Sequence, residues 1–387
     1  MKYLDFPLDE MEQRVINAQR LLAKEGMSGM VVTAAANHFY FSGIRKLANW
    51  ATFTRTVFVF LPTDKKPVLY VQEFDGPEAE SRSSIRDVRT YPDIMGGPVH
   101  GVVEILRELG MDRGKVGWEL GYEQRLDMAV SDYNAVKDLV PNAEFIDASE
   151  LIWQLRMIKL PSEIACLRKA NDIASRAFDR VFGEISEGMT EKEVARKFVA
   201  IMAEEGAELP GFIIVLSGPG NYDRIAARPT NKRIEKGDLV WIDAGVNYDG
   251  YWTDFCRAGV VGGATAEQNR LQNIIVDITR TACDEVKPGL PVSDLYNICA
   301  EQFLAYGLPW SFECGRAGHG VGLQLTEPPS IARVDSTILE PGMVITLEPG
   351  YVNEFGCFDC EENILVTETG SEILTSARRE LHYIPLA

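Results

Sequence analysis

Residues 239–261 read LVWIDAGVNYDGYWTDFCRAGVV. Two runs of apolar, aromatic and β-branched residues flank the turn-forming sequence at residues 247–250, and this pattern predicts a β-hairpin. Each run contains one aspartate, Asp243 in the first and Asp254 in the second. An acid in a mostly apolar strand is costly to bury, so both positions need a physical explanation.

The register of this hairpin decides how close the two acids lie. If Tyr248 and Asp249 form the loop, Asp243 and Asp254 face each other with Cβ atoms about 4.5–5.5 Å apart. If Asp249 and Gly250 form the turn, the pair is diagonal and still within reach of a shared ion. Opposed carboxylates resist burial unless a cation compensates, so the pair predicts a metal site. The alternative is that one aspartate faces solvent or caps the turn.

Residues 343–367, MVITLEPGYVNEFGCFDCEENILVT, repeat the arrangement with glutamates. Strand-like runs lie on both sides of a turn centred on Glu354 and Phe355. That turn places Glu348 opposite Glu361. The sequence therefore predicts a second pair of facing carboxylates.

The segment GRAGHGVGLQLTEPP, residues 315–329, lies between the two hairpins. His319 stands among three glycines, where the backbone can approach closely and little screens the imidazole. Alone, such a histidine favours a turn or core role. Together with the four acids it completes a set of hard donors suited to two divalent ions, Mn, Co, Zn or ferrous iron. The predicted ligands are Asp243, Asp254, His319, Glu348 and Glu361.

Composition bounds the function. A composition of 46% hydrophobic and 25% charged residues is typical of a globular protein. A length of 387 residues favours two domains. The formal net charge of −18 disfavours nucleic acid and anionic membranes as partners, and leaves small molecules or peptides. No run is apolar enough for a membrane span and no signal peptide is evident at the start. The seven cysteines, with one isolated CxxC at residues 357–360, indicate a reducing compartment, so we expect a cytoplasmic protein.

Helix-like and strand-like segments alternate up to about residue 155, which predicts an α/β N-terminal domain. A long helical pattern follows residues 155–161. Beyond it, strands with glycine-rich turns are interrupted by helices near 265–286 and 292–306, which predicts an α+β domain. The expected domains are residues 1–157 and 158–387.

These motifs resemble those of the creatinase/prolidase/aminopeptidase P family, the pita-bread metallopeptidases, over nearly the whole chain. The resemblance implies an α/β creatinase-like N-terminal domain and an α+β pita-bread catalytic domain. It also implies that the family's usual homodimer forms. The matching segments are residues 36–44 (ANHFYFSGI), 155–170 (LRMIKLPSEIACLRKA), 239–257 (LVWIDAGVNYDGYWTDFCR), 318–329 (GHGVGLQLTEPP), 339–352 (LEPGMVITLEPGYV) and 360–370 (CEENILVTETG).

The resemblance implies a role for each matched position. Asp243 would bind one metal ion, His319 and Glu348 would hold mainly the other, and Asp254 and Glu361 would bridge both. A hydroxide shared by the ions would be the nucleophile. Glu348 would shuttle its proton, so His319 and Glu348 count as catalytic as well as metal-binding residues.

Three positions depart from the peptidase pattern. Thr326 stands where the family usually has a second histidine, and Ala226 stands where it has another on the loop before the first hairpin. Those imidazoles normally stabilise the tetrahedral intermediate and bind the substrate. Asp359 stands where a basic residue is common.

We therefore expect a dinuclear hydrolase that cleaves a C–N bond in an Xaa-Pro peptide or a small amide-like metabolite. Thr326 would contact the substrate. Arg228, Arg257 or Arg316 would orient the carboxylate of the substrate. One alternative is a lyase like those that act on dimethylsulfoniopropionate, although Gly245 and Leu325 stand where its acids would be. The other is a non-catalytic binding module, although such modules tend to lose the ligands.

Overall fold

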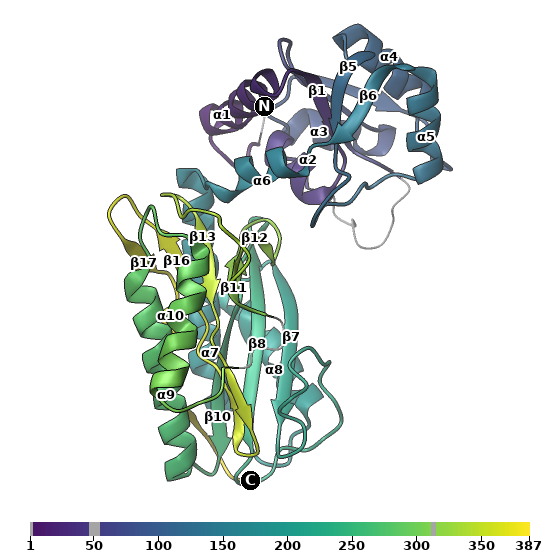
Figure 1. Cartoon of the computed structure of the whole chain (residues 1–387). Helices are drawn as coiled ribbons and strands as arrows, with labels where there is room; N and C mark the ends of the chain where they lie inside the picture. The colour runs from purple at the N-terminus through teal and green to yellow at the C-terminus, as the bar shows by residue number, and fades with distance from the viewer. Residues whose placement is uncertain (1–2, 46–54, 311–314) are drawn as a thin grey trace. The chain divides into compact units, whose positions relative to one another are not determined.

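The computed structural model describes residues 3–45, 55–310 and 315–387. The chain divides into two compact units, Met1–Arg156 and Met157–Ala387 (Figure 1). Each unit has its own apolar core, and each is considered by itself below.

The N-terminal unit is built on a sheet with strand order β4-β3-β2-β1-β5-β6. Strands β1, β5 and β6 run parallel to one another, and β2 is antiparallel to both of its neighbours. The strands are β1 (Met27–Val32), β2 (Phe58–Pro62), β3 (Val68–Gln72), β4 (Asp87–Tyr91), β5 (Arg113–Trp118) and β6 (Asn142–Asp147).

Helices cover this sheet because their apolar residues recur on one face. In α4, Val102, Val103 and Leu106 are buried against Phe60, Val116 and other strand residues. The helices of the unit are α1 (Leu8–Lys24), α2 (Ala35–Ser42), α3 (Gly76–Arg82), α4 (Val99–Leu109), α5 (Val130–Leu139) and α6 (Ser149–Met157), and a short 3-10 helix, η1, spans Glu73–Asp75. The predicted α/β architecture is confirmed.

The first sheet of the C-terminal unit has strand order β18-β10-β8-β7, and the short β9 pairs with β8. Helices α7 (Pro161–Glu184) and α8 (Glu191–Glu205) pack on it through edge-on and tilted contacts of Phe178 with Phe198 and Phe255. The strands are β7 (Leu209–Ser217), β8 (Leu239–Tyr248), β9 (Tyr251–Trp252), β10 (Phe255–Val261) and β18 (His382–Ile384).

The second sheet of this unit has strand order β12-β11-β13-β16-β17, and β14 and β15 form a separate ribbon. Helices α9 (Ala266–Glu285) and α10 (Val292–Ala305) occur where the sequence predicted helices and share an apolar core with this sheet. The strands are β11 (Arg316–Gly320), β12 (Glu327–Ala332), β13 (Val344–Leu347), β14 (Tyr351–Asn353), β15 (Gly356–Phe358), β16 (Glu362–Val366) and β17 (Ser371–Ile373).

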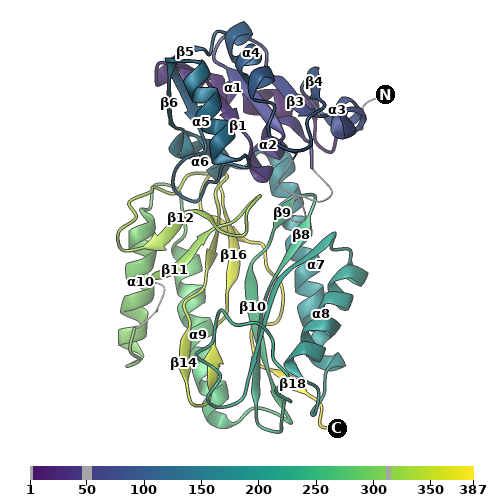
Figure 2. The same cartoon turned by 90° about the vertical axis from the view of Figure 1, so that its right-hand side faces the viewer.

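The two sheets of the C-terminal unit lie between two pairs of helices. Figure 2 shows α7 and α8 on the outer side of β8 and β10, and α9 and α10 on the outer side of β11 and β16. Because helices cover both outer faces, the strands that carry the acids and His319 meet in the interior. The predicted α+β catalytic domain is confirmed.

The register of the first hairpin differs from the one favoured from the sequence. Tyr248 pairs with Tyr251, so Asp249 and Gly250 form the turn, and both have positive φ angles of 49° and 88°. Positive φ at both positions defines a type I′ turn, whose twist matches that of the strands. Asp243 therefore pairs with Cys256 and lies diagonal to Asp254, as in the alternative register.

The register of the second hairpin is the predicted one. Asn353 pairs with Gly356 around the turn, and Leu347 pairs with Glu362 further along. Glu348 and Glu361 lie in the short breaks between these two ladders, at matching positions.

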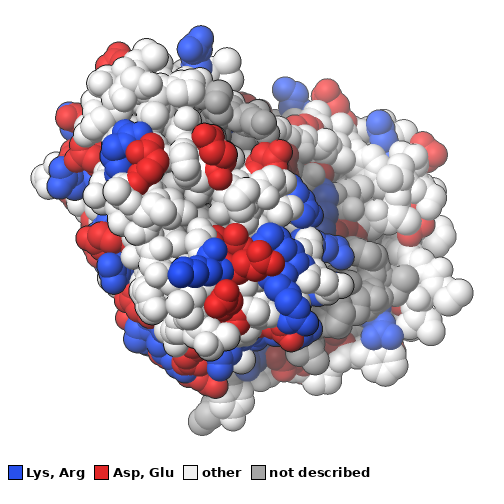
Figure 3. All heavy atoms as spheres, turned by 90° about the horizontal axis from the view of Figure 1, so that it is seen from below, with Lys and Arg blue, Asp and Glu red and all other residues white. Residues whose placement is uncertain are grey.

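Charge is mixed over the surface. On the face drawn in Figure 3, Lys and Arg lie interspersed with Asp and Glu, so the excess of acids does not form one patch there. None of the cysteines within the described residues forms a disulfide, and Cys357 and Cys360 belong to a buried apolar cluster. Among the helices of the described residues, none combines the length and apolar character that crossing a bilayer requires.

Candidate metal centre

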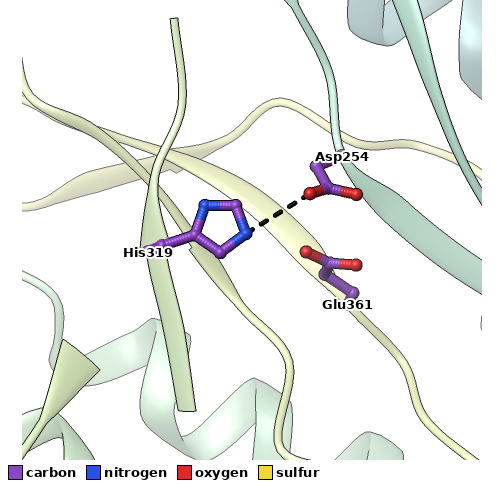
Figure 4. Close-up of side chains that lie close together, drawn as sticks. All are labelled: Asp254, His319 and Glu361. Atoms are coloured by element: carbon purple, nitrogen blue, oxygen red, sulfur yellow. Dashed lines mark ion pairs between the residues drawn. The ribbon is translucent and has the colours of Figure 1, made fainter. Parts of the chain in front are cut away.

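Three side chains from separate strands converge inside the C-terminal unit. His319 lies on β11, Asp254 lies between β9 and β10, and Glu361 directly precedes β16. One ligand atom of each lies within 4.8 Å of the other two, and all three residues are buried. Figure 4 shows the three side chains pointing toward one another.

The imidazole of His319 is oriented by its own strand. Its Nδ1 lies 2.8 Å from the carbonyl oxygen of Gly320, which can only accept a hydrogen bond, so Nδ1 carries a hydrogen. Nε2 therefore faces the acids, 3.3 Å from Oδ2 of Asp254 and 3.8 Å from Oε1 of Glu348. A fixed tautomer of this kind is what a metal-binding histidine requires.

The glycines beside His319 allow β11 to approach its neighbours closely. A Cβ atom on Gly318 would lie 2.1 Å from the carbonyl oxygen of Thr346, and one on Gly320 would lie 2.2 Å from that of Pro328. Real Cβ atoms do not approach so closely, so only glycine fits at both positions. The hydroxyl of Thr346 also accepts a hydrogen bond from the backbone N–H of His319.

The segments that carry Asp254 and Glu361 are fixed by polar side chains. The Asn363 amide donates to the backbone carbonyl of Asp254 and its oxygen accepts from the Asp254 N–H. The Arg257 guanidinium donates to the backbone carbonyl of Glu361 at 2.7 Å. The sequence analysis did not find the role of Asn363, because an asparagine inside an apolar run carries no recognisable signal.

Asp243 and Glu348, the other two predicted ligands, lie within electrostatic reach of the three convergent residues. The charges of Asp254 and Glu348 act on Asp243, and the charges of His319 and Asp254 act on Glu348. Glu348 is more accessible than Asp254, with 21% of its side chain exposed against 8%.

Burial and mutual repulsion work against ionisation of these acids. Burial, followed by the charges of Asp254 and Glu348, raises the pKa values of Asp243 and Glu361 well above the usual range. Burial likewise raises the pKa of Glu348. For His319, burial opposes the charged form, but the hydrogen bond to Asp254 and the charge of Glu348 outweigh it and raise the pKa.

The arrangement fits divalent cations. Oδ1 of Asp243 and Oε1 of Glu361 are buried and have no hydrogen-bond partner. A buried carboxylate oxygen without a partner costs free energy that a bound cation would recover. The donor set of carboxylates and one imidazole matches the preference of Mn, Co, Zn or ferrous ions.

The structure separates the three arginines proposed for substrate binding. Arg257 is 1% exposed, and its guanidinium donates to Glu362 and to backbone carbonyls. It therefore positions the chain around Glu361, and its predicted contact with substrate stays a prediction that these bonds do not favour. Arg228 is exposed in the loop between β7 and β8, whereas the charge of Arg316 acts on His319 and Glu348. Arg316 is the best placed of the three for a substrate carboxylate.

Thr326 and Ala226 both lie in loops. Thr326 is half-buried between β11 and β12, and Ala226 is exposed between β7 and β8. Their effect on the reaction stays a prediction.

Asp359 is a further acid that the sequence analysis noted only as a departure. It is 6% exposed, and burial raises its pKa to about 8. Its charge acts on Asp243 and Glu361.

Fold and site together define a metal-dependent hydrolase, and comparison with known families agrees. A model of metallopeptidase family M24 matches residues 165–368, and a model of the creatinase/prolidase N-terminal domain matches residues 14–158. The chain belongs to metallopeptidase family M24.

Named relatives cover more than nine tenths of the chain. The Xaa-Pro dipeptidase of Pyrococcus furiosus is 31% identical over 96% of this chain and 100% of its own length. The prolidase structure from that organism has a TM-score of 0.79 at 30% identity and covers 93% of this chain and 99% of its own. The Xaa-Pro dipeptidase structure from Bacillus anthracis has a TM-score of 0.83 at 27% identity, over 97% and 100% of the two chains.

Proposed function

We propose that this protein is a two-metal dipeptidase that cleaves Xaa-Pro dipeptides. The observation that carries the proposal is the buried convergence of Asp254, His319 and Glu361 within 4.8 Å. It occurs in a chain that is 31% and 30% identical to two Xaa-Pro dipeptidases over 96% and 97% of its length. The printed names of those relatives supply the substrate class.

Each of the five ligands has a proposed place. Asp243 would hold one ion, His319 and Glu348 would hold the other, and Asp254 and Glu361 would bridge them. When bound, the ions supply Lewis-acid chemistry: they polarise the scissile carbonyl and lower the pKa of water.

Glu348 is the proposed proton carrier. Its exposure is larger than that of Asp254, so it can exchange protons with bound substrate and solvent. Arg316, whose charge acts on His319 and Glu348, would orient the substrate carboxylate.

An apolar wall beside Asp243 supports a proline-containing substrate. Gly245 lies two residues further along β8 and hence on the same face of the strand. A Cβ atom on Gly245 would meet Leu325 at 3.0 Å and Phe212 at 3.4 Å, and both side chains are half-buried. Such a surface suits a pyrrolidine ring better than a charged side chain.

Gly245 also argues against the lyase alternative. A Cβ atom there would lie 2.6 Å from the carbonyl oxygen of Thr253, so an acid at this position would not fit without moving the backbone. The site offers no carboxylate at residue 245 or 325 for that chemistry.

The test is a substrate panel with metal-reconstituted protein. Ala-Pro, Pro-Ala and a non-peptide amide would be assayed with Mn or Co, after metal content is measured. We expect about two ions per chain and release of free proline from Ala-Pro. Two bound ions without turnover of any Xaa-Pro dipeptide would replace the proposed substrate by a small amide, and an absence of bound metal would leave only a binding role.

We further propose a cytoplasmic homodimer that uses manganese. Buried cysteines outside disulfides fit a reducing compartment, and carboxylate-rich sites suit manganese. Light scattering gives the assembly, and a mass of one chain, 43.1 kDa, would exclude the dimer. Metal analysis of protein purified without added metal gives the ion.

A further inference from the structure

Asp359 lies in the short break between β15 and β16, two residues before Glu361. Its side chain is almost entirely buried. The hydrogen bonds that it accepts come from the thiol of Cys256 and the backbone N–H of Cys360. These bonds fix the carboxylate without neutralising it, because neither donor carries a positive charge.

The same thiol connects Asp359 to the metal centre. Cys256 is the cross-strand partner of Asp243 in the β8–β10 ladder. Directly opposed residues have Cβ atoms about 4.5–5.5 Å apart on one face of the sheet. Asp359 and Asp243 therefore both lie next to Cys256, and the charge of Asp359 acts on Asp243.

Both carboxylates present an unsatisfied oxygen. Oδ1 of Asp359 and Oδ1 of Asp243 are buried and have no hydrogen-bond partner. Arg257 is a buried cation, but it does not neutralise Asp359 directly. Its N–H groups donate to Glu362 and to backbone carbonyls. Two unpaired carboxylate oxygens in one buried region are costly when charged, and a bound cation would recover that cost.

We propose that Asp359 is a further cation-binding carboxylate of the centre and binds the same divalent ion as Asp243. This inference rests on the proposed metal centre and adds a fifth carboxylate to its four acids and one histidine. An extra hard, charged donor raises the affinity for the ion on the Asp243 side and favours hard ions such as manganese.

The experiment compares metal binding in the full chain and the isosteric variant Asp359→Asn, by calorimetric titration with Mn²⁺. Wild-type protein should bind two ions. The variant should bind one of them at least about tenfold more weakly and the other normally. Activity is not the readout, so failure of this inference is distinct from failure of the proposed peptidase reaction.

Asp238→Asn is the matched control. Asp238 is also a buried aspartate of this unit, but its carboxylate pairs with Lys232 at 2.6 Å. It directly precedes β8 and lies five residues before Asp243, or about 17 Å at the usual rise per residue. The control should bind both ions as wild type does.

Binding of both ions by Asp359→Asn with wild-type affinity would overturn the proposal and leave Asp359 as a protonated neighbour of Asp243. Binding of no ion by wild type would overturn both this inference and the metal centre. A zinc-loaded crystal structure tests the proposal without any variant. Oδ1 of Asp359 should lie about 2.0–2.2 Å from one ion, and a distance beyond about 3.5 Å would contradict it.

Discussion

Asp254 is the residue that connects His319 with the other acids of the metal centre. Its carboxylate lies 3.3 Å from His319, its backbone is bound by Asn363, and its charge acts on Asp243 and Glu361. An ion held by His319 and Glu361 is also within reach of Asp254, because the ligand atoms of the three lie within 4.8 Å of one another.

Asp254→Asn should therefore abolish metal binding and activity together. An amide keeps the shape of the side chain but removes the charge that offsets two cations. Metal content after dialysis and turnover of Ala-Pro give the two readouts. Asp249→Asn, in the turn of the same hairpin, should leave both unchanged, because asparagine tolerates positive φ. Activity that persists in the metal-free Asp254 variant would sink the proposed site.

A second buried acid, Glu119, follows β5 in the N-terminal unit. Its carboxylate accepts hydrogen bonds from the backbone of Ala34 and from the side chains of Thr33 and Asn37. Burial nevertheless outweighs these bonds and raises the pKa of Glu119 from 4.5 to about 7. The folded state therefore binds this proton more tightly than the unfolded chain does.

Stability of the N-terminal unit should consequently depend on pH. The contribution of Glu119 is complete below pH 4.5 and is lost as pH rises to about 7, a change of about 3 kcal/mol. Urea unfolding at pH 5 and pH 7.5 measures it. Glu119→Gln should flatten this difference, whereas the exposed Glu144→Gln should retain it. An unchanged pH dependence in Glu119→Gln would contradict the assignment.

At the scale of elements, β11 is the strand that brings His319 to the acids. It contacts β12 on one side and β13 on the other, and its glycines make both approaches possible. The position of the imidazole therefore depends on backbone spacing as well as on its own rotamer.

Gly318→Ala should displace β11 from β13, because the new methyl group would overlap the carbonyl of Thr346. We expect a loss of about 1–3 kcal/mol in the free energy of unfolding and weaker metal binding. Gly183→Ala is the control, since that glycine in α7 has no atom within 4 Å of its Cβ position and alanine is the better helix former. Equal effects of the two substitutions would show that strand spacing is not what holds His319.

At the scale of the whole molecule, the ions would stabilise one unit specifically. The predicted ligands all belong to the C-terminal unit, on or beside β8, β10, β11, β13 and β16. Without ions, their buried carboxylates repel one another.

Removal of metal with a chelator should therefore lower amide protection in those strands. At a metal concentration a hundredfold above Kd, each ion adds about 2.7 kcal/mol to stability. Hydrogen exchange with Mn and with chelator measures the difference, and β1 and β5 of the N-terminal unit serve as the internal reference. A uniform change over both units would contradict ligand-specific stabilisation.

The strand register could be predicted for one of the two hairpins and not for the other, for a physical reason. Around Glu354 and Phe355 a single turn fits, so the pairing of the second hairpin followed from the sequence. Residues 247–250 permit two turns, and the positive φ angles at Asp249 and Gly250 decided between them. The sequence therefore permitted both registers, and the one favoured from it, with Asp243 facing Asp254, was wrong.

The hairpin of residues 239–261 and the site around it also combine features that the sequence determines with features that only tertiary packing determines. An apolar period of two and turn residues predict strands locally, so the two hairpins follow from the sequence alone. Helical spacing of apolar residues likewise predicts the helices near 266–285 and 292–305. The change from one pattern to the other predicts the two units. Three features could not be predicted from the sequence: the positioning role of Arg257, the support from Asn363 and the closeness of Asp359 to Asp243. These depend on contacts between segments far apart in the chain, and only tertiary packing brings such segments together.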